Sequence, residues 1–74
     1  MSKAILGPFN ETDARIIIAD LTNAIQSNDP MQIMAAMSRN TISWTQPPIP
    51  ATDVYIDLTG KYQQLILEAM KRLY

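Results

Sequence analysis

The chain has 74 residues, which leaves room for a single small domain over residues 1–74 and excludes a multidomain enzyme. Six basic and seven acidic residues give a net charge of −1, which disfavours nucleic acids and other polyanions as partners. The sequence has no cysteine and no histidine, so disulfides, Cys/His zinc sites, thiol nucleophiles and Ser-His-Asp triads are excluded.

The small size of the chain points to association. Ordering each residue costs about 1.5 kcal/mol, which the core of so short a chain barely offsets. Since disulfides and a Cys/His metal site are excluded, stability has to come from tight helix packing, from a second copy, or from another protein. We therefore expect self-association as a symmetric homodimer.

Targeting signals are missing from the sequence. The first nine residues lack the basic segment and apolar run of a secretory signal, and no run of about 18 apolar residues occurs anywhere. Neither end carries a lipidation motif. These observations predict a cytoplasmic protein with no membrane attachment.

The first helix is expected over residues 11–27. Asn10 is a favourable N-cap, and Glu11 and Asp13 complement the positive end of the helix dipole. Apolar residues then recur at steps of three and four, which is the pattern of one buried helix face.

A second helix is expected over residues 30–39. Asp29 is a favourable N-cap, and Pro30 follows it at the first helical position. Ser27 and Asn28 alone separate the two helices, so the chain must turn sharply there. Asn40 is expected to end the second helix in a left-handed conformation.

Residues 41–52 interrupt the helical pattern. Pro47, Pro48 and Pro50 remove three backbone donors and favour an extended path, so this segment is expected to form a proline-rich strap between helices. Trp44 either covers the open end of the helix pair or serves, beside the prolines, as an anchor for a partner protein.

The third helix is expected over residues 53–73, with Lys71 and Arg72 at its negative end. Gly60 leaves a second interpretation open, in which residues 54–58 form a short strand and Thr59 caps a helix that starts at Gly60. The long helix is favoured because the apolar pattern keeps its phase across the glycine. The fold class is therefore all-α, a small three-helix domain.

Acidic and hydroxyl side chains do not form a recognisable catalytic set. Asp53 and Asp57 would share one helix face but lack a third metal ligand, and their position near a helix start explains them as capping and dipole residues. Asp13 and Asp20 are expected on a solvated face. A serine nucleophile has no histidine base, so we expect no enzyme, no metal and no cofactor.

The second helix carries a stripe of methionines at a spacing of three, Met31, Met34 and Met37. Flexible thioethers fill irregular cores and also suit adaptable binding surfaces. The sequence leaves open whether this stripe is core or interface.

Without catalytic groups, the sequence favours a non-enzymatic protein–protein interaction module. We expect a small adaptor or inhibitor that binds and modulates another protein, the kind of short, cysteine-free helical chain that bacteria and phages encode. The aromatic and methionine side chains best suited to anchor a partner are Trp44, Met34, Met37, Tyr55, Tyr62 and Tyr74. Two alternatives remain, a structural subunit of a larger assembly and a DNA-binding transcriptional regulator that reads a duplex with its second helix.

Overall fold

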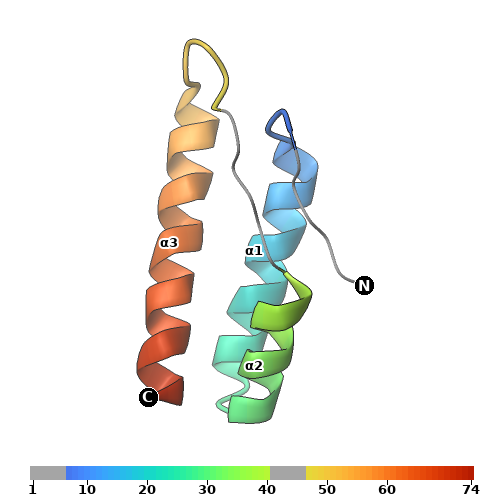
Figure 1. Cartoon of the computed structure of the whole chain (residues 1–74), viewed down its shortest axis with the longest axis vertical. Helices are drawn as coiled ribbons and strands as arrows, with labels where there is room; N and C mark the ends of the chain where they lie inside the picture. The colour runs from blue at the N-terminus through green and yellow to red at the C-terminus, as the bar shows by residue number, and fades with distance from the viewer. Residues whose placement is uncertain (1–6, 41–46) are drawn as a thin grey trace.

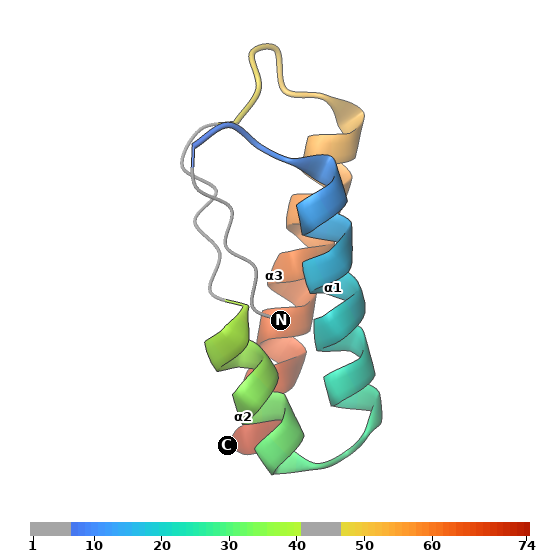
Figure 2. The same ribbon diagram turned by 90° about the vertical axis from the view of Figure 1, so that its right-hand side faces the viewer.

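The computed structural model describes residues 7–40 and 47–74, which contain three helices and no strand. They are α1 (Glu11–Gln26), α2 (Pro30–Arg39) and α3 (Asp53–Leu73) (Figure 1). α1 and α3 run side by side in the same direction, and α2 returns antiparallel to them along their lower half (Figure 2). The expectation of a small all-helical domain with three helices is confirmed for the described residues.

Each helix begins at a capping side chain. Asn10 accepts a hydrogen bond from a backbone N–H of the first turn of α1 at 3.0 Å, and Asp29 does the same for α2 at 3.0 Å. Both caps are as predicted. Thr52 caps α3 at 3.1 Å, a role that was not predicted from the sequence. These bonds satisfy N–H groups that have no partner within a helix.

The turn between α1 and α2 depends on Asn28, which has a φ of 57°. Asparagine tolerates this left-handed conformation better than most residues because its short polar side chain can bond locally. Asn40 has a φ of −115° and ends α2 without entering the left-handed region, so the prediction for Asn40 is wrong. α1 ends at Gln26, one residue before the predicted boundary.

α3 is continuous through Gly60 over 21 residues, so the alternative with a strand at residues 54–58 is wrong. The apolar residues before and after Gly60 pack against the same core, so the helix passes through the glycine without a new start. Lys71 and Arg72 lie in the last turn of α3, as predicted.

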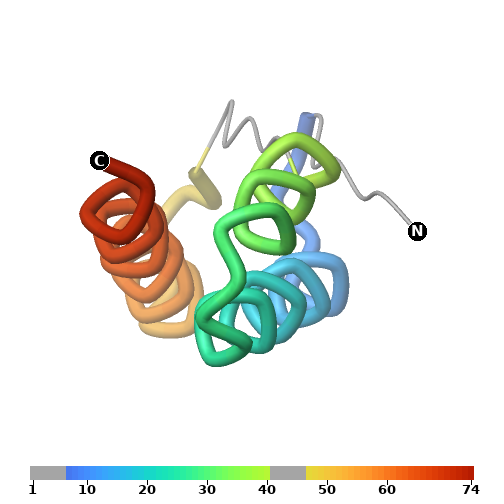
Figure 3. The backbone as a smooth tube through the Cα atoms, turned by 90° about the horizontal axis from the view of Figure 1, so that it is seen from below, coloured from blue at the N-terminus to red at the C-terminus, as the bar shows by residue number. Residues whose placement is uncertain are grey.

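The hydrophobic core lies along α1. Viewed down the long axis, α2 and α3 lie on different sides of α1, and neither of the other two described helices covers the far side of α3 (Figure 3). α1 contributes five of the nine buried apolar residues, whereas the longer α3 contributes two. The buried apolar residues are Ala14, Ile17, Leu21, Ala24, Ile25, Ile33, Ala36, Leu58 and Ala69. Most of the surface of α3 is thus left outside the core.

The predicted strap is described in part. Residues 47–52 form a non-helical loop that leads into α3, with a cis peptide bond between Ile49 and Pro50, and Ile49 is exposed. Residues 41–46, including Trp44, lie outside the described residues, so the prediction for the strap as a whole stays a prediction. Among the described helices, none combines the length and apolar character needed to cross a bilayer.

Candidate functional site

A polar cluster holds α2 against α1. The Arg39 guanidinium donates two hydrogen bonds to the Asp20 carboxylate, at 3.0 Å from Nε and 2.9 Å from Nη2. The buried Asn40 amide donates to the same carboxylate and to the Ala36 carbonyl oxygen, the latter at 2.9 Å. A two-point bond between guanidinium and carboxylate fixes orientation as well as distance, so this cluster sets the position of α2.

The environment of Asp20 corrects the expectation that it lies on a solvated face. The hydrogen bond from Arg39 lowers the pKa of Asp20 below its usual value, and the bond from Asn40 adds to that effect against the opposing effect of burial. The sequence pattern missed this residue because its partners lie about 20 positions away, beyond the reach of helical periodicity.

Two contacts fix α3 at its ends. Near the start of α3, the rings of Phe9 and Tyr55 meet edge to face with centroids 5.0 Å apart. Near its end, Arg72 donates a hydrogen bond of 2.5 Å to the side chain of Asn28 in the α1–α2 turn. α3 is therefore held along its whole length, and the side that faces away from the core is presented in a defined orientation.

That side carries a row of six positions, exposed to solvent except for the partly buried Gly60, which we name the outer stripe of α3. Leu67 is 60% exposed and Ile56 is 59% exposed, although both are large apolar side chains. The outer stripe consists of Ile56, Gly60, Gln63, Leu67, Met70 and Tyr74. Scattered exposed apolar residues are ordinary on a protein surface, whereas an aligned row along one helix face is a candidate interaction surface.

A shallow groove joins the outer stripe to the edge of the core. Tyr62, Gln63, Ile66 and Leu67 line it, and its volume is about 330 Å³. Tyr62 and Ile66 also pack against the core, so apolar surface continues from the core through Ile66 to the exposed Leu67, with the polar Gln63 beside it. Burial raises the pKa of the Tyr62 phenol above its usual value.

The charged side chains of α3 lie along a different flank. Lys61 pairs with Asp57 at 3.3 Å, and Arg72 pairs with Glu68 at 3.4 Å. Lys71 has no ion-pair partner within residues 7–40 and 47–74. α3 therefore has three sides, one packed on the core, one charged and one apolar and exposed.

The methionine stripe of α2 divides between core and surface. Met37 packs against the core, whereas Met31 is 73% exposed and Met34 is 54% exposed. The question left open by the sequence thus has a different answer for each end of the stripe. Met31 and Met34 form a second exposed apolar surface, which we name the α2 methionine pair.

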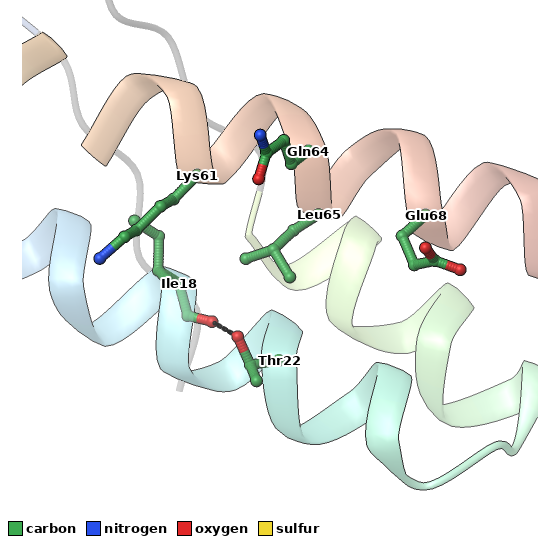
Figure 4. Close-up of a pocket in the computed structure, with 6 residues that line it drawn as sticks. All are labelled: Ile18, Thr22, Lys61, Gln64, Leu65 and Glu68. Carbon is green, nitrogen blue, oxygen red and sulfur yellow. Dashed lines mark hydrogen bonds between the residues drawn. The ribbon is translucent and has the colours of Figure 1, made fainter. Parts of the chain in front are cut away.

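A second groove of about 310 Å³ runs between α1 and α3. Figure 4 shows Lys61 and Glu68 at its two ends and Leu65 between them, with Thr22 of α1 on the opposite wall. The Thr22 hydroxyl donates to the Ile18 carbonyl oxygen at 2.7 Å. This hydroxyl is committed to the backbone of its own helix, and the two possible bases of the groove, Lys61 and Glu68, are paired with Asp57 and Arg72.

Metal binding and duplex recognition find little support in the described residues. No group of three or more Asp or Glu side chains there could hold a metal ion. α2, whose ten residues are all described, carries one cation, Arg39, and Asp20 binds it. A helix that reads DNA needs free cations for phosphate contacts.

The six predicted anchors do not converge on one site. Met34 and Tyr74 are exposed, on α2 and at the end of α3. Met37, Tyr55 and Tyr62 are half-buried in the single chain, and Trp44 lies outside the described residues. The outer stripe shares only Tyr74 with this set. In the sequence, the outer stripe could have been found as a second row of residues on the third helix at steps of four and three. This row lies on a different helix face from the apolar residues that pack in the core.

Comparison with protein families, curated proteins and solved structures finds no match to this chain.

Proposed function

We propose that this chain is a non-enzymatic protein-binding module, a small cytoplasmic adaptor or inhibitor that acts by occupying the surface of another protein and that forms a homodimer. The observation that carries the proposal is that α2 and α3 each expose large apolar side chains, in the α2 methionine pair and in the outer stripe, and that α3 is fixed at both ends to the rest of the fold. A fixed apolar face binds at lower entropic cost than a mobile one.

The shape of the surface favours a macromolecular partner over a small ligand. Both grooves are shallow and open, whereas small-molecule sites are concave and enclose most of their ligand. The outer stripe runs for about 27 Å at the helical rise of 1.5 Å per residue. Protein interfaces use extended surfaces of this kind and are enriched in Met and Tyr.

The α2 methionine pair supports an adaptor. It lies on a different helix from the outer stripe, so the two apolar surfaces can be occupied independently. Methionine side chains adapt to partners of different shape because they are unbranched and polarizable. We therefore assign the α2 methionine pair to the heterologous partner.

In-cell photo-crosslinking tests this proposal. A photo-reactive amino acid at Met34 is expected to join the chain to a defined heterologous protein, and the same group at the exposed Asn23 of α1 is expected not to. Met31→Glu places a charge beside the contact and is expected to reduce the Met34 product about tenfold, with circular dichroism unchanged. The proposal is wrong if neither Met34 nor Met31, substituted in turn, gives a heterologous product in a folded chain.

A further inference from the structure

We propose that the outer stripe of α3 binds a second copy of this chain, with the two α3 helices packed antiparallel about a twofold axis at the level of Leu65, next to Gln64. This inference rests on the proposed function, in which the outer stripe is a binding surface, and it names the occupant and its orientation. Three independent features of α3 support it: the spacing of the stripe, an unexplained glycine and the order of charges along its flank.

The spacing of the stripe is that of a helix-pairing seam. Its six positions alternate steps of four and three, which is the heptad pattern through which two helices interlock side chains. A straight helix drifts by about 20° per heptad relative to such a row, and this row is shorter than three heptads. The seam therefore stays in contact from Ile56 to Tyr74 without a long supercoil.

One antiparallel register uses every position of the seam. A parallel pair would instead place each residue level with itself, so that Gly60 would meet Gly60 and leave a gap. In the antiparallel register the facing pairs are Ile56 with Tyr74, Gly60 with Met70, and Gln63 with Leu67. The smallest residue of the seam, Gly60, then faces the long side chain of Met70, as close packing requires.

Gly60 has no explanation within the single chain. Glycine weakens a helix relative to alanine, yet a Cβ added at Gly60 would meet nothing within 4 Å and the residue is helical. Next to an antiparallel copy, the missing side chain makes room for Met70, whose flexible thioether can fill the space. Gly60 thus lowers the stability of the helix in the isolated chain but allows close packing in the antiparallel dimer.

The charges along the seam complement each other in the antiparallel orientation alone. Asp57, Gln64 and Lys71 follow one another at steps of seven on the same flank. In the antiparallel register, Asp57 lies beside Lys71 of the second copy, and the two Gln64 side chains meet next to the axis. Lys71, which lacks an ion-pair partner in the described part of the chain, gains one. Opposed helix dipoles add to the preference.

Light scattering across a hundredfold concentration range tests the interface. The unmodified chain is expected to shift from monomer to dimer, and Leu67→Glu is expected to raise the dissociation constant at least about a hundredfold by placing a charge inside the seam. Met31→Glu is the matched control, since it puts the same charge on an exposed apolar site outside the seam, and it is expected to leave the dimer intact. A chain that stays monomeric, or a Leu67→Glu variant that still dimerises, overturns the proposal.

A charge exchange tests the register. Lys71→Glu faces Asp57 of the second copy with a like charge and is expected to weaken the dimer about tenfold. The double variant Asp57→Lys and Lys71→Glu restores opposite charges and is expected to recover most of the affinity. Failure of the double variant to recover overturns the antiparallel register.

Crosslinking tests the orientation directly, because the chain has no native cysteine. Gln64→Cys, next to the axis, is expected to crosslink to itself through a short bis-maleimide. Lys71→Cys is expected to crosslink with Asp57→Cys in a mixture but not with itself, since the two copies of residue 71 lie about 18 Å apart along the helices. Self-crosslinking of Lys71→Cys overturns the proposal.

The same variants separate this proposal from the proposed function. Photo-crosslinking from Met34 reports the heterologous partner, and light scattering reports the second copy. A monomeric chain that still gives the Met34 product contradicts the dimer alone. A dimer without any heterologous product contradicts the adaptor alone.

Discussion

Thr59 illustrates how a single polar atom can weaken a small core. Within residues 7–40 and 47–74, its hydroxyl is the one buried side-chain polar atom without a hydrogen-bond partner. Burying such a group without a bond costs free energy that an apolar side chain of similar shape would not. Thr59→Val is therefore expected to raise the free energy of unfolding by about 1 kcal/mol in urea denaturation.

Thr22 provides the matched control for Thr59. Its partly buried hydroxyl donates to the Ile18 carbonyl oxygen, so Thr22→Val removes a satisfied bond. We expect this variant to be neutral or slightly destabilised. Equal gains in both variants would show that valine itself, and not the unpaired hydroxyl, causes the effect.

Asp20 makes the stability of the chain sensitive to acid. The hydrogen bond from Arg39 lowers the pKa of Asp20 in the folded state. The ionised Asp20 carboxylate therefore stabilises the fold fully at pH values above its unfolded pKa near 3.8, and this stabilisation is lost as the pH falls through the folded pKa. Asp20→Asn is expected to lower the Tm by about 3 °C at neutral pH. The difference from the unmodified chain should shrink as the pH falls below 3.8.

Glu11→Gln is the control for Asp20→Asn. Its partner Arg15 lies one helical turn away at 2.9 Å, and both side chains are more than half exposed. Exposed pairs of this type contribute little, so the Tm should change less than for Asp20→Asn. An equal change would argue against a special role for the link between α1 and α2.

At the scale of the element, Gly60 has opposite effects on the helix and on the pair. Gly60→Ala is expected to stabilise the monomer by about 1 kcal/mol, because alanine is the better helix former and its Cβ meets open space. The same variant is expected to weaken the dimer, because the new methyl group occupies the space assigned to Met70. Thermal unfolding at low concentration and light scattering at high concentration measure the two effects separately.

The helices were predictable because their signals are local. The caps at Asn10 and Asp29 fixed two helix starts, and an apolar row in constant phase predicted α3 through Gly60. The left-handed residue was assigned to Asn40 instead of Asn28, since both are asparagines at a helix boundary. Which of the two asparagines is left-handed depends on the path of the turn, and that path depends on how α1 and α2 pack.

The candidate site was less predictable because it depends on which faces the fold leaves uncovered. The methionines of α2 share a spacing of three, yet Met37 is half-buried against the core and Met31 is left exposed. The outer stripe was masked by the stronger core row on the same helix. The partners of Asp20 became visible only once α2 lay against α1.

At the scale of the whole molecule, stability is distributed unevenly among the helices. α2 has ten residues and two fully buried apolar side chains, Ile33 and Ala36, and a helix of this length is marginal without tertiary contacts. We expect α2 amides to exchange with deuterium at least about tenfold faster than those in the middle of α1. Uniform protection across the three helices would contradict this.

The link between Asp20 and Arg39 controls that local opening. Arg39→Ala removes both guanidinium bonds that hold α2 on α1. We expect it to speed exchange in α2 further and to leave the middle of α1 unchanged. If all helices accelerated together, α2 would unfold with the rest of the domain and not as a separate unit.

The three-sided character of α3 has a genetic consequence. Substitutions on its core side, such as at Leu58, reduce the amount of folded protein, whereas substitutions on the outer stripe, such as at Leu67, leave abundance intact and affect association alone. In a library of single variants scored separately for abundance and for self-association, the positions sensitive to substitution should therefore form two rows along α3. The row that lowers abundance should lie on the core face, and the row that lowers self-association should lie on the outer stripe. Positions on the charged side, such as Gln64 and Glu68, should tolerate most substitutions in the abundance score.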